Sequence, residues 1–478
     1  MNNKRIISLD QGSSSSRALV FDEQGQVLAR AGRALDTRRP TPNQAEFDAW
    51  ALWQGQREAL LEVLGQTDPA DEICLAVACQ RSSIVFWDKN TGKPLAPALS
   101  WQDGRAQAQS DAVTLPQETI HQITGLYKTP FYSAAKISWT LQHVPEVAQA
   151  AAQDNLCVGP VASFVIWHLT EGKVFACDPT LAQRTLLFNI STFQWEPQLL
   201  QAFGIKQEWL PQIKKTTDDY GVFSHEGRRI SIRVCVGDQQ AALQALRVVS
   251  GGACINYGTG AFFMRNTGRQ CHFLPGLLTS IGAEESEYLL EGPVNVCGTI
   301  FTWLNEIGIS CAADEIDALC EKATQAVQFL PALGGLGAPY WDYSISPVFA
   351  GFTPHTKKAD IILGAVEGLT CLLADIVFYM ERYGIKSTEI KVSGGLSKSR
   401  TLLHSQADIL QSRLLPCSET EGTAVGAALL AAKAFGVDSA QWETMRILPA
   451  VDPQIDPLVA EEKYIRWHQF LTWCKSKN

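Results

Sequence analysis

The feature that most constrains this chain is a local pattern that occurs twice: an apolar strand, a turn, and a second strand. The first copy runs from Arg5 to Phe21 through the turn Asp10-Gln-Gly12. The second runs from Gly252 to Met264 through Gly258-Thr-Gly260. Glycine and aspartate at such points supply the backbone freedom of tight turns. Two such openings predict two related domains, with the functional site between them, where pockets commonly form.

Further segments fit two α/β domains. A helical pattern covers Phe47–Leu64, and Cys74–Cys79 is typical of a buried strand. In the second half, Ile361–Tyr383 predicts a long helix, Ile390–Ser393 a strand that ends at Gly394-Gly395, and Ala424–Phe435 an apolar helix. A chain of 478 residues is too long for a single core. We expect an N-terminal domain over residues 1–246 and a C-terminal domain over residues 247–478.

Charge and composition exclude several classes of function. The net charge is −9 without a long basic or acidic run, which argues against nucleic acid or a membrane surface as partner. The thirteen cysteines form no CxxC pair and are typical of reduced thiols. The N-terminal apolar stretch is too short for a signal peptide, and Ile361–Met380 is interrupted by Glu367 and Asp375. We therefore expect a cytoplasmic protein.

The first turn carries residue types suited to phosphate binding. Asp10 at a strand end can hold Mg²⁺, and Gly12 lets the backbone turn so that the next amides and hydroxyls face phosphate oxygens. Arg17 offers a planar fork of donors. The alternative is a hairpin turn that is rich in serine for solubility.

Glycines of the second half indicate further nucleotide contacts. Gly258-Thr-Gly260 can expose amides as a second phosphate clamp, or it can be an ordinary hairpin turn. Gly394-Gly395 allows a flat ring to approach, or it simply joins a strand to a helix. The sequence contains no Walker A loop, dinucleotide fingerprint or zinc-binding spacing.

A second acidic residue follows a buried strand. Asp238 lies in Gly237-Asp-Gln-Gln240, directly after the apolar run Ile232–Val236. A carboxylate at this place can act as a catalytic base in a cleft. It can also cap the helix that follows, and the two roles are compatible.

In this order, the motifs resemble the FGGY carbohydrate kinases, and among them the glycerol kinases most. The similar segments span Leu9 to Gly436. They are Asp10–Arg17, Gln80-Arg81, Trp101–Asp103, Arg184–Ile190, Gly237–Ala242, Tyr257–Gly260, Leu336–Trp341, Gly394-Gly395 and Thr423–Ala427. The resemblance implies two actin-like, ribonuclease H-like domains that close on ATP and a small sugar or polyol in an interdomain cleft.

The resemblance also implies roles for individual residues. Asp238 would be the general base, and Asp10 and Asp238 would hold Mg²⁺. ATP would be bound by Gly12, Ser13, Ser14, Arg17, Gly258, Thr259, Gly260, Gly298, Thr302, Gly395 and Ser399. The acceptor would contact Arg81, Ser82, Trp101, Phe131, Tyr132, Asp238, Gln239 and Phe262. Phosphoryl transfer fits such a set, because it needs alignment, charge neutralisation and a carboxylate within reach of the attacking hydroxyl.

The acceptor residues depart from glycerol kinases at two positions. A glutamate follows the arginine in those enzymes, whereas Ser82 follows Arg81 here. Their tyrosine falls on Phe131, although a shift of one residue would let Tyr132 serve. Each lost hydrogen bond weakens discrimination by roughly 1–3 kcal/mol. We predict a larger acceptor, such as a tetritol, pentitol or ketose; alternatively, water or a neighbouring side chain replaces the contacts and glycerol remains the substrate.

Two other classes of function use the same scaffold. A non-catalytic sensor would use closure around a sugar as a signal, but the sequence shows no added partner-binding tail. An ATPase of the actin or chaperone type would share the phosphate loops without needing Arg81, Trp101 and Asp238. The resemblance also implies a homodimer.

Overall fold

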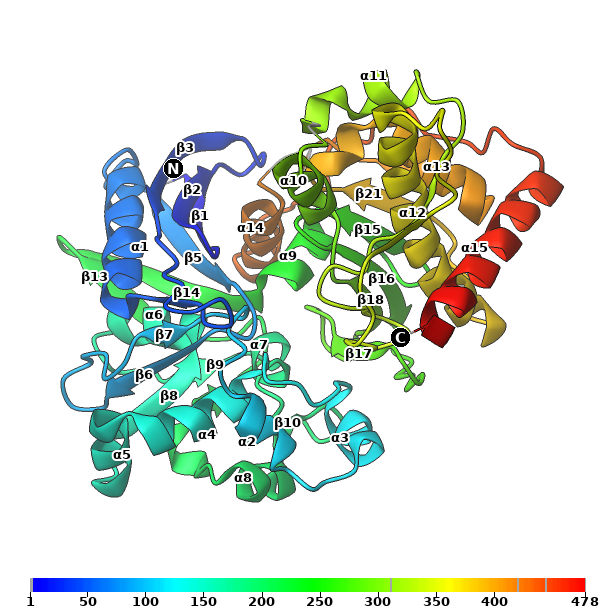
Figure 1. Cartoon of the computed structure of the whole chain (residues 1–478). Helices are drawn as coiled ribbons and strands as arrows, with labels where there is room; N and C mark the ends of the chain where they lie inside the picture. The colour runs from blue at the N-terminus through cyan, green and yellow to red at the C-terminus, as the bar shows by residue number, and fades with distance from the viewer. Residues whose placement is uncertain (1–2, 310–311, 419–420, 443–444, 478) are drawn as a thin grey trace. The chain divides into compact units, whose positions relative to one another are not determined.

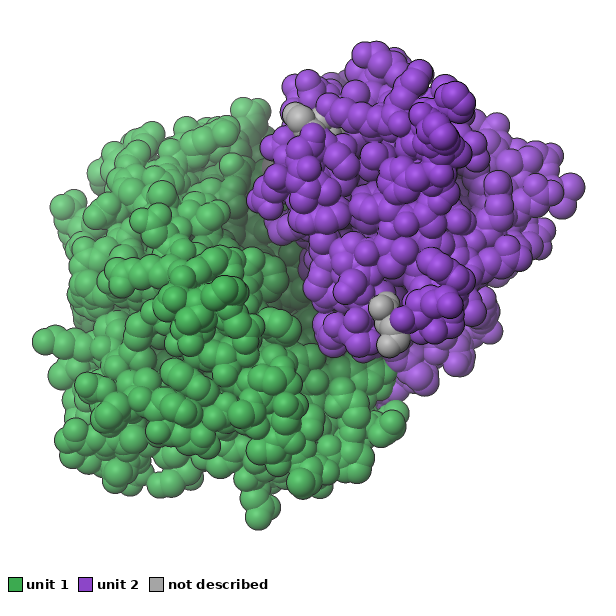
Figure 2. Space-filling model, viewed as in Figure 1, with its two compact units in different colours: residues 1–247, 280–287, 420–444 green, residues 248–279, 288–419, 445–478 purple. Residues whose placement is uncertain are grey.

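The computed structural model describes residues 3–309, 312–418, 421–442 and 445–477. The chain forms two compact units, which Figure 2 shows in different colours. Unit 1 comprises residues 1–247, 280–287 and 420–444, and unit 2 comprises residues 248–279, 288–419 and 445–478. Unit 1 thus gathers three separate stretches of the sequence.

The main sheet of unit 1 has six strands in the order β13-β14-β5-β1-β2-β3. Their bounds are Lys4–Gln11 (β1), Ser15–Phe21 (β2), Val27–Ala34 (β3), Glu72–Cys79 (β5), Val222–His225 (β13) and Arg228–Gly237 (β14). The pairs β1–β2 and β2–β3 are antiparallel, whereas β5 lies parallel to both β1 and β14. The central strands are buried on both faces, which explains the continuous apolar run in β5.

Helices on this sheet include α1 (Ala49–Leu64), α9 (Asp238–Ala245) and α14 (Gly422–Ala434). Helix α14 comes from late in the sequence and lies beside α9 in Figure 1. The close approach depends on Gly426, because a Cβ there would lie 1.7 Å from the carbonyl oxygen of Ala241. A run of small residues thus lets α14 pack tightly within unit 1.

The remainder of unit 1 extends this core. A smaller sheet has the strand order β4-β7-β6-β8 and is accompanied by short helices. Its strands are Glu46–Phe47 (β4), Ile84–Asp88 (β6), Ala98–Leu99 (β7) and Leu156–Pro160 (β8). The helices include α2 (Gln107–Asp111), α3 (Gln117–Thr124), α4 (Ser133–His143), α5 (Pro145–Ala152), α6 (Val161–Leu169), α7 (Pro179–Gln183) and α8 (Pro197–Phe203).

Unit 2 contains a six-stranded sheet in the order β17-β18-β16-β15-β21-β22. Its strands are Ala253–Tyr257 (β15), Ala261–Gly268 (β16), Leu278–Ile281 (β17), Tyr288–Val294 (β18), Ile390–Ser393 (β21) and Leu414–Pro416 (β22). The helices of this unit include α10 (Gly298–Glu306), α11 (Ile316–Cys320), α12 (Lys358–Arg382), α13 (Arg400–Leu410) and α15 (Pro457–Lys477). It has its own hydrophobic core, separate from that of unit 1.

The long helix α12 covers the apolar segment discussed above. By length and composition alone it could cross a membrane, but 78% of its apolar window is buried inside the protein. Asp375, one of its two interrupting acids, accepts hydrogen bonds from Tyr464 Oη at 2.8 Å and Trp467 Nε1 at 3.0 Å, both on α15. The helix therefore serves as the core helix of unit 2. The cysteines in the described part of the chain are free thiols.

The two main sheets repeat one topology. In each, an antiparallel three-stranded meander begins at the central strand (β1 or β15), which is parallel to the strand on its other side (β5 or β21). A further parallel strand follows in both sheets, β14 in unit 1 and β22 in unit 2. The predicted duplication of a ribonuclease H-like fold is confirmed.

Candidate active site

The serine-rich turn of unit 1 connects β1 to β2. The Gly12 amide donates to the Ser15 carbonyl at 3.0 Å, which closes the turn. Gln80, at the end of β5, donates through its backbone amide to the Gln11 carbonyl and through its side chain to the Gly12 carbonyl, at 2.9 and 3.1 Å. The turn is therefore fixed to the adjacent parallel strand, with Ser14 on the exposed side.

Arg17 lies opposite Asp10 in the register of β1 and β2. Its Nη2 is 2.7 Å from Asp10 Oδ2, and its Nη1 forms a second ion pair with Glu421. Glu421 directly precedes α14 and was not among the predicted site residues. The guanidinium fork of Arg17 is thus shared by two carboxylates from distant parts of the sequence.

Burial governs the protonation of Asp10. Its side chain is 2% exposed, and this desolvation raises the pKa of Asp10 to about 6. Arg17 acts in the opposite direction, while the negative charges of Asp238 and Glu421 raise the pKa further. Asp10 Oδ2 is the oxygen that Arg17 Nη2 approaches to 2.7 Å. A divalent cation fits this carboxylate, because a further positive charge would stabilise the ionised form that burial disfavours.

Asp238 is the first residue of α9, and Gly237 occupies the N-cap position without a side-chain cap. The alternative that Asp238 caps this helix is therefore wrong. Its Oδ1 lies 3.7 Å from Arg81 Nε and accepts a hydrogen bond from the Gln239 amide at 2.7 Å. Gln239 Oε1 is buried, with no hydrogen-bond partner in the described part of the chain. This leaves a polar group at the first turn of α9 that can bind a hydroxyl.

Other predicted acceptor residues lie on neighbouring segments of unit 1. The Trp101 amide donates to Ser83 Oγ, and its indole Nε1 donates to Ser13 Oγ, both at 2.9 Å. Ser133 Oγ, which directly follows Phe131 and Tyr132, donates to the Ser82 carbonyl at 3.2 Å. Trp101 and Phe131 are 38% and 39% exposed, so both rings are accessible to a ligand.

Unit 2 brings together the glycines of its own turn. The Gly298 amide donates to the Gly258 carbonyl at 3.0 Å, and the Cys297 amide donates to the Thr259 carbonyl at 2.9 Å. A Cβ on Gly298 would lie only 3.0 Å from the Gly258 carbonyl oxygen. The start of α10 and the turn from Gly258 to Gly260 are therefore held together by backbone hydrogen bonds, in which the Cys297 and Gly298 amides donate to carbonyls of the turn.

The other predicted residues of unit 2 differ in accessibility. Thr302 lies on the first turns of α10 and is exposed, as is Gly395 after β21. Ser399 is 6% exposed, accepts from the Leu402 amide as the N-cap of α13, and donates to Asp317 Oδ1 at 2.7 Å. Its hydroxyl therefore has a structural role. Phe262 lies in β16, opposite Asn256.

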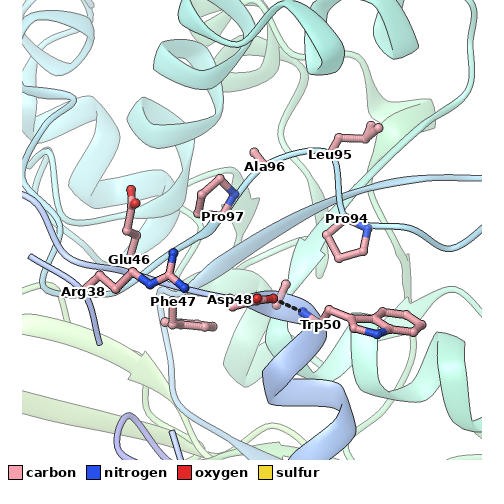
Figure 3. Close-up of a pocket in the computed structure, with 10 residues that line it drawn as sticks. Arg38, Glu46, Phe47, Asp48, Trp50, Pro94, Leu95, Ala96 and Pro97 are labelled. Atoms are coloured by element: carbon pink, nitrogen blue, oxygen red, sulfur yellow. Dashed lines mark hydrogen bonds between the residues drawn. The ribbon is translucent and has the colours of Figure 1, made fainter. Parts of the chain in front are cut away.

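Two cavities are lined by none of the predicted site residues. Figure 3 shows one in unit 1, of about 350 Å³, where Arg38, Trp50 and Pro97 surround the N-cap Asp48, which accepts from the Trp50 amide. The other, of about 920 Å³, lies in unit 2 between α12, α13 and α15. Both are separate from the charged residues at Asp10 and Asp238.

Comparison with known proteins gives these features a context. The model of the N-terminal domain of the FGGY family of carbohydrate kinases matches residues 5–244, and that of the C-terminal domain matches residues 253–435. The chain is 37% identical to a glycerol kinase of Shewanella pealeana, over 99% of both chains. A glycerol kinase of Thermus brockianus is also 37% identical, over 89% of each.

Solved structures agree with the fold. A Plasmodium falciparum glycerol kinase with ADP superposes with a TM-score of 0.92 at 27% identity, covering 99% of this chain and 98% of that one. A gluconate kinase of Lactobacillus acidophilus gives 0.87 at 21% identity, covering 98% of each chain. The second of these likenesses, at its lower identity, concerns the fold alone.

Two ribonuclease H-like units, matched along their length by both family models, define the class of the protein. The chain belongs to the FGGY family of carbohydrate kinases. It is an ATP-dependent kinase whose acceptor is an alcohol group of a small molecule. This membership favours the kinase hypothesis over the non-catalytic sensor and the simple ATPase.

Proposed function

We propose that this kinase phosphorylates a hydroxyl of a polyol or ketose larger than glycerol, with Asp238 as general base. The acceptor hydroxyl gives its proton to the Asp238 carboxylate and forms a bond to the γ-phosphorus, while the bond between that phosphorus and the β–γ bridging oxygen breaks. The observation that carries the proposal is the Asp238 carboxylate, 3.7 Å from Arg81 and next to Gln239, whose buried Oε1 has no hydrogen-bond partner among the described residues.

The size of the acceptor follows from the position after Arg81. Ser82 is shorter than the glutamate that resembling enzymes carry there, and it lacks a carboxylate to accept from polyol hydroxyls. Removing such an acceptor costs roughly 1–3 kcal/mol of discrimination. The extra space would accommodate at least one more hydroxymethyl group.

The residues around Asp10 fit a magnesium ion. Mg²⁺ is usually held by one or two carboxylates together with substrate phosphates and water. Among the described residues no group of three or more His, Cys, Asp or Glu side chains is arranged as a metal site. Asp10 and Asp238 would hold the ion, which supplies charge neutralisation for the phosphates. Arg17 would then exchange carboxylate partners for phosphate oxygens.

The decisive experiment is an acceptor panel that follows ADP formation with glycerol, tetritols, pentitols and ketoses. We expect kcat/KM for the best larger acceptor to exceed that for glycerol by at least about tenfold. Turnover of glycerol at the highest rate would contradict the acceptor assignment. An absence of turnover with every acceptor, while ATP still binds, would contradict the general-base assignment as well.

The substitution Ser82→Glu tests whether the missing carboxylate after Arg81 explains the preference for a larger acceptor. It restores a carboxylate beside Arg81, so we expect kcat/KM for glycerol to rise by about tenfold or more and that for the larger acceptor to fall. The control for this substitution must add the same charge away from the predicted acceptor residues. Ser110→Glu on α2 is less suitable as that control, because Ser110 is buried. Ser191→Glu, at an exposed turn, is the better control and should change neither value.

Glycerol itself is the second candidate acceptor. The observation in its favour is that relatives covering nearly the whole chain are named glycerol kinases. The sequence also retains four of the residues expected to contact a triol, namely Arg81, Trp101, Asp238 and Gln239. The acceptor panel distinguishes the two candidates directly.

The expected cytoplasmic location and homodimer stay predictions. Fractionation of cells that express the tagged protein would test the first. Sedimentation equilibrium, with an expected mass of twice 52.4 kDa, would test the second.

A further inference from the structure

A fully buried lysine lies within unit 1. Lys136, the fourth residue of α4, is 0% exposed. Lysine is almost never fully buried unless its charge is paired. Its Nζ donates to two backbone carbonyl oxygens, that of Ser100 at 2.6 Å and that of Ser82 at 3.1 Å. The side chain therefore ties two loops of the main chain together.

The two carbonyls adjoin predicted acceptor residues. The Ser82 carbonyl follows Arg81 by one residue, and the Ser100 carbonyl belongs to the peptide that leads into Trp101. Ser133, at the start of the same helix, also donates to the Ser82 carbonyl. One turn of α4 thus fastens three segments that carry the acceptor-binding side chains, namely 80–83, 100–103 and 131–133.

The backbone of Ser82 has a conformation that needs such support. Its φ is +64°, in the left-handed region that is uncommon for residues other than glycine. The orientation of the following peptide, whose carbonyl Lys136 and Ser133 hold, decides where the Ser82 side chain points. Without these donors the peptide could relax toward an ordinary conformation and turn Ser82 away from Arg81.

The environment of the ammonium supports a role beyond packing. Burial lowers the pKa of Lys136 to about 7; the Asp103 carboxylate raises it and the Arg105 guanidinium lowers it further. Arg105 itself pairs with Asp103 and Glu46. An apolar residue would fill this site without the cost of burying an ammonium, so the hydrogen bonds to the two carbonyls are the property that only a long donor side chain provides.

We propose that Lys136 is a positioning residue for the acceptor, which holds the peptides after Ser82 and before Trp101 in their binding geometry. The proposal rests on the proposed function, because it assigns acceptor binding to Arg81, Ser82 and Trp101. It predicts that loss of the ammonium weakens acceptor binding much more than nucleotide binding, because the held segments touch the predicted nucleotide residues only indirectly, through hydrogen bonds such as that from Trp101 to Ser13.

The test compares Lys136→Met with Ser138→Ala in steady-state assays on the full-length enzyme, using the best acceptor from the panel. For Lys136→Met we expect the KM for the acceptor to rise at least tenfold and the KM for ATP to rise by no more than about threefold. Ser138 is a matched control because it is buried on the same helix but donates to the Phe203 carbonyl at 2.5 Å. Ser138→Ala should leave both KM values within twofold.

A second pair of variants tests the proposal in case Lys136→Met does not fold. Ser133→Ala removes one donor to the Ser82 carbonyl, and Ser133→Thr keeps the hydroxyl. We expect the acceptor KM to rise about threefold for the alanine variant and to return toward wild type for threonine. If Lys136→Met shows no cooperative thermal transition, this pair decides the matter.

Equal rises in both KM values, or a lower Tm with both KM values unchanged, would overturn the positioning role. So would an unchanged acceptor KM in Ser133→Ala if Lys136→Met does not fold. Failure of the proposed function is distinguishable, because it shows in the wild type as an absence of turnover with every acceptor, and the proposal for Lys136 then falls with it.

Discussion

The two turns that follow the central strands, after β1 in unit 1 and after β15 in unit 2, have the same place in the same topology but different chemistry. The first carries charge, since Asp10 and Arg17 face each other and Glu421 completes the group. The second carries glycine, and its carbonyls accept hydrogen bonds from the start of α10. The two copies of the fold thus differ at the same place: one turn presents paired ionised side chains, and the other is built from glycines and backbone hydrogen bonds.

The strongest test of this difference is Asp238→Asn in the charged unit. Loss of the base should lower kcat by about 10²–10⁴-fold and leave ATP affinity nearly unchanged, since the amide cannot take the acceptor proton. Steady-state kinetics and nucleotide titration measure the two quantities. Asp111→Asn, an exposed acid on α2, is the control and should keep full activity. A variant with kcat near wild type would show that the base lies elsewhere.

An intermediate effect is expected for Asp10→Asn, measured as stability against pH. Wild-type Asp10 keeps its proton in the folded state up to a pKa of about 6, against an ordinary value of 3.8. The folded state then binds more protons than the unfolded state, so this group lowers stability as pH rises from about 4 to 6. The asparagine variant lacks that loss, which amounts to about 3 kcal/mol for a shift of about two pH units.

Denaturant unfolding at pH 4, 5, 6 and 7, without added Mg²⁺, would follow this trend. The stability of the variant relative to wild type should increase from pH 4 to about pH 6 and then level off toward pH 7. Asp36→Asn, a substitution of an exposed carboxylate, should show no such trend. A constant difference between Asp10→Asn and wild type would mean that Arg17 already compensates the buried charge in full.

The smallest effect is expected in the glycine-rich unit, for Gly298→Ala. The new Cβ would lie 3.0 Å from the Gly258 carbonyl oxygen, so the turn must shift by a few tenths of an ångström. We expect the KM for ATP to rise by up to about tenfold, or roughly 1.4 kcal/mol, while the acceptor KM stays constant. Gly65→Ala at the end of α1, where the nearest atom is 3.4 Å away and belongs to the same helix, serves as control. A larger effect on the acceptor KM than on the KM for ATP would contradict the expected difference in role between the two turns.

Local patterns allowed much of the fold to be predicted. The strand Ile390–Ser393 agrees with β21 residue for residue, because an apolar run ends at a glycine pair. The long helix and the strand–turn–strand openings also agree with the structure, since their signals lie within a few neighbouring residues.

The contacts that complete the site could not be predicted in the same way. Glu421 reaches Arg17 only because α14 returns to unit 1, and no local pattern reports a contact across 404 positions of the sequence. In the sequence, Lys136 is one polar residue of an amphipathic helix, which indicates exposure. Its burial follows from the loops that pack around it in the structure. The left-handed φ of Ser82 likewise depends on its hydrogen-bonded surroundings rather than on the serine itself.

The membership of α14 in unit 1 has a consequence for the order of folding. The face of α9 and the end of β1 at Asp10 are without their contacts to α14 until that helix has been synthesised. Helix α14 leaves the ribosome only after the whole main sheet of unit 2. Contacts of such long sequence separation form late, because a large loop must close before they are made. The unit whose translation starts first is therefore completed late, because it needs α14. Glu421, the ionic partner of Arg17, arrives together with that helix.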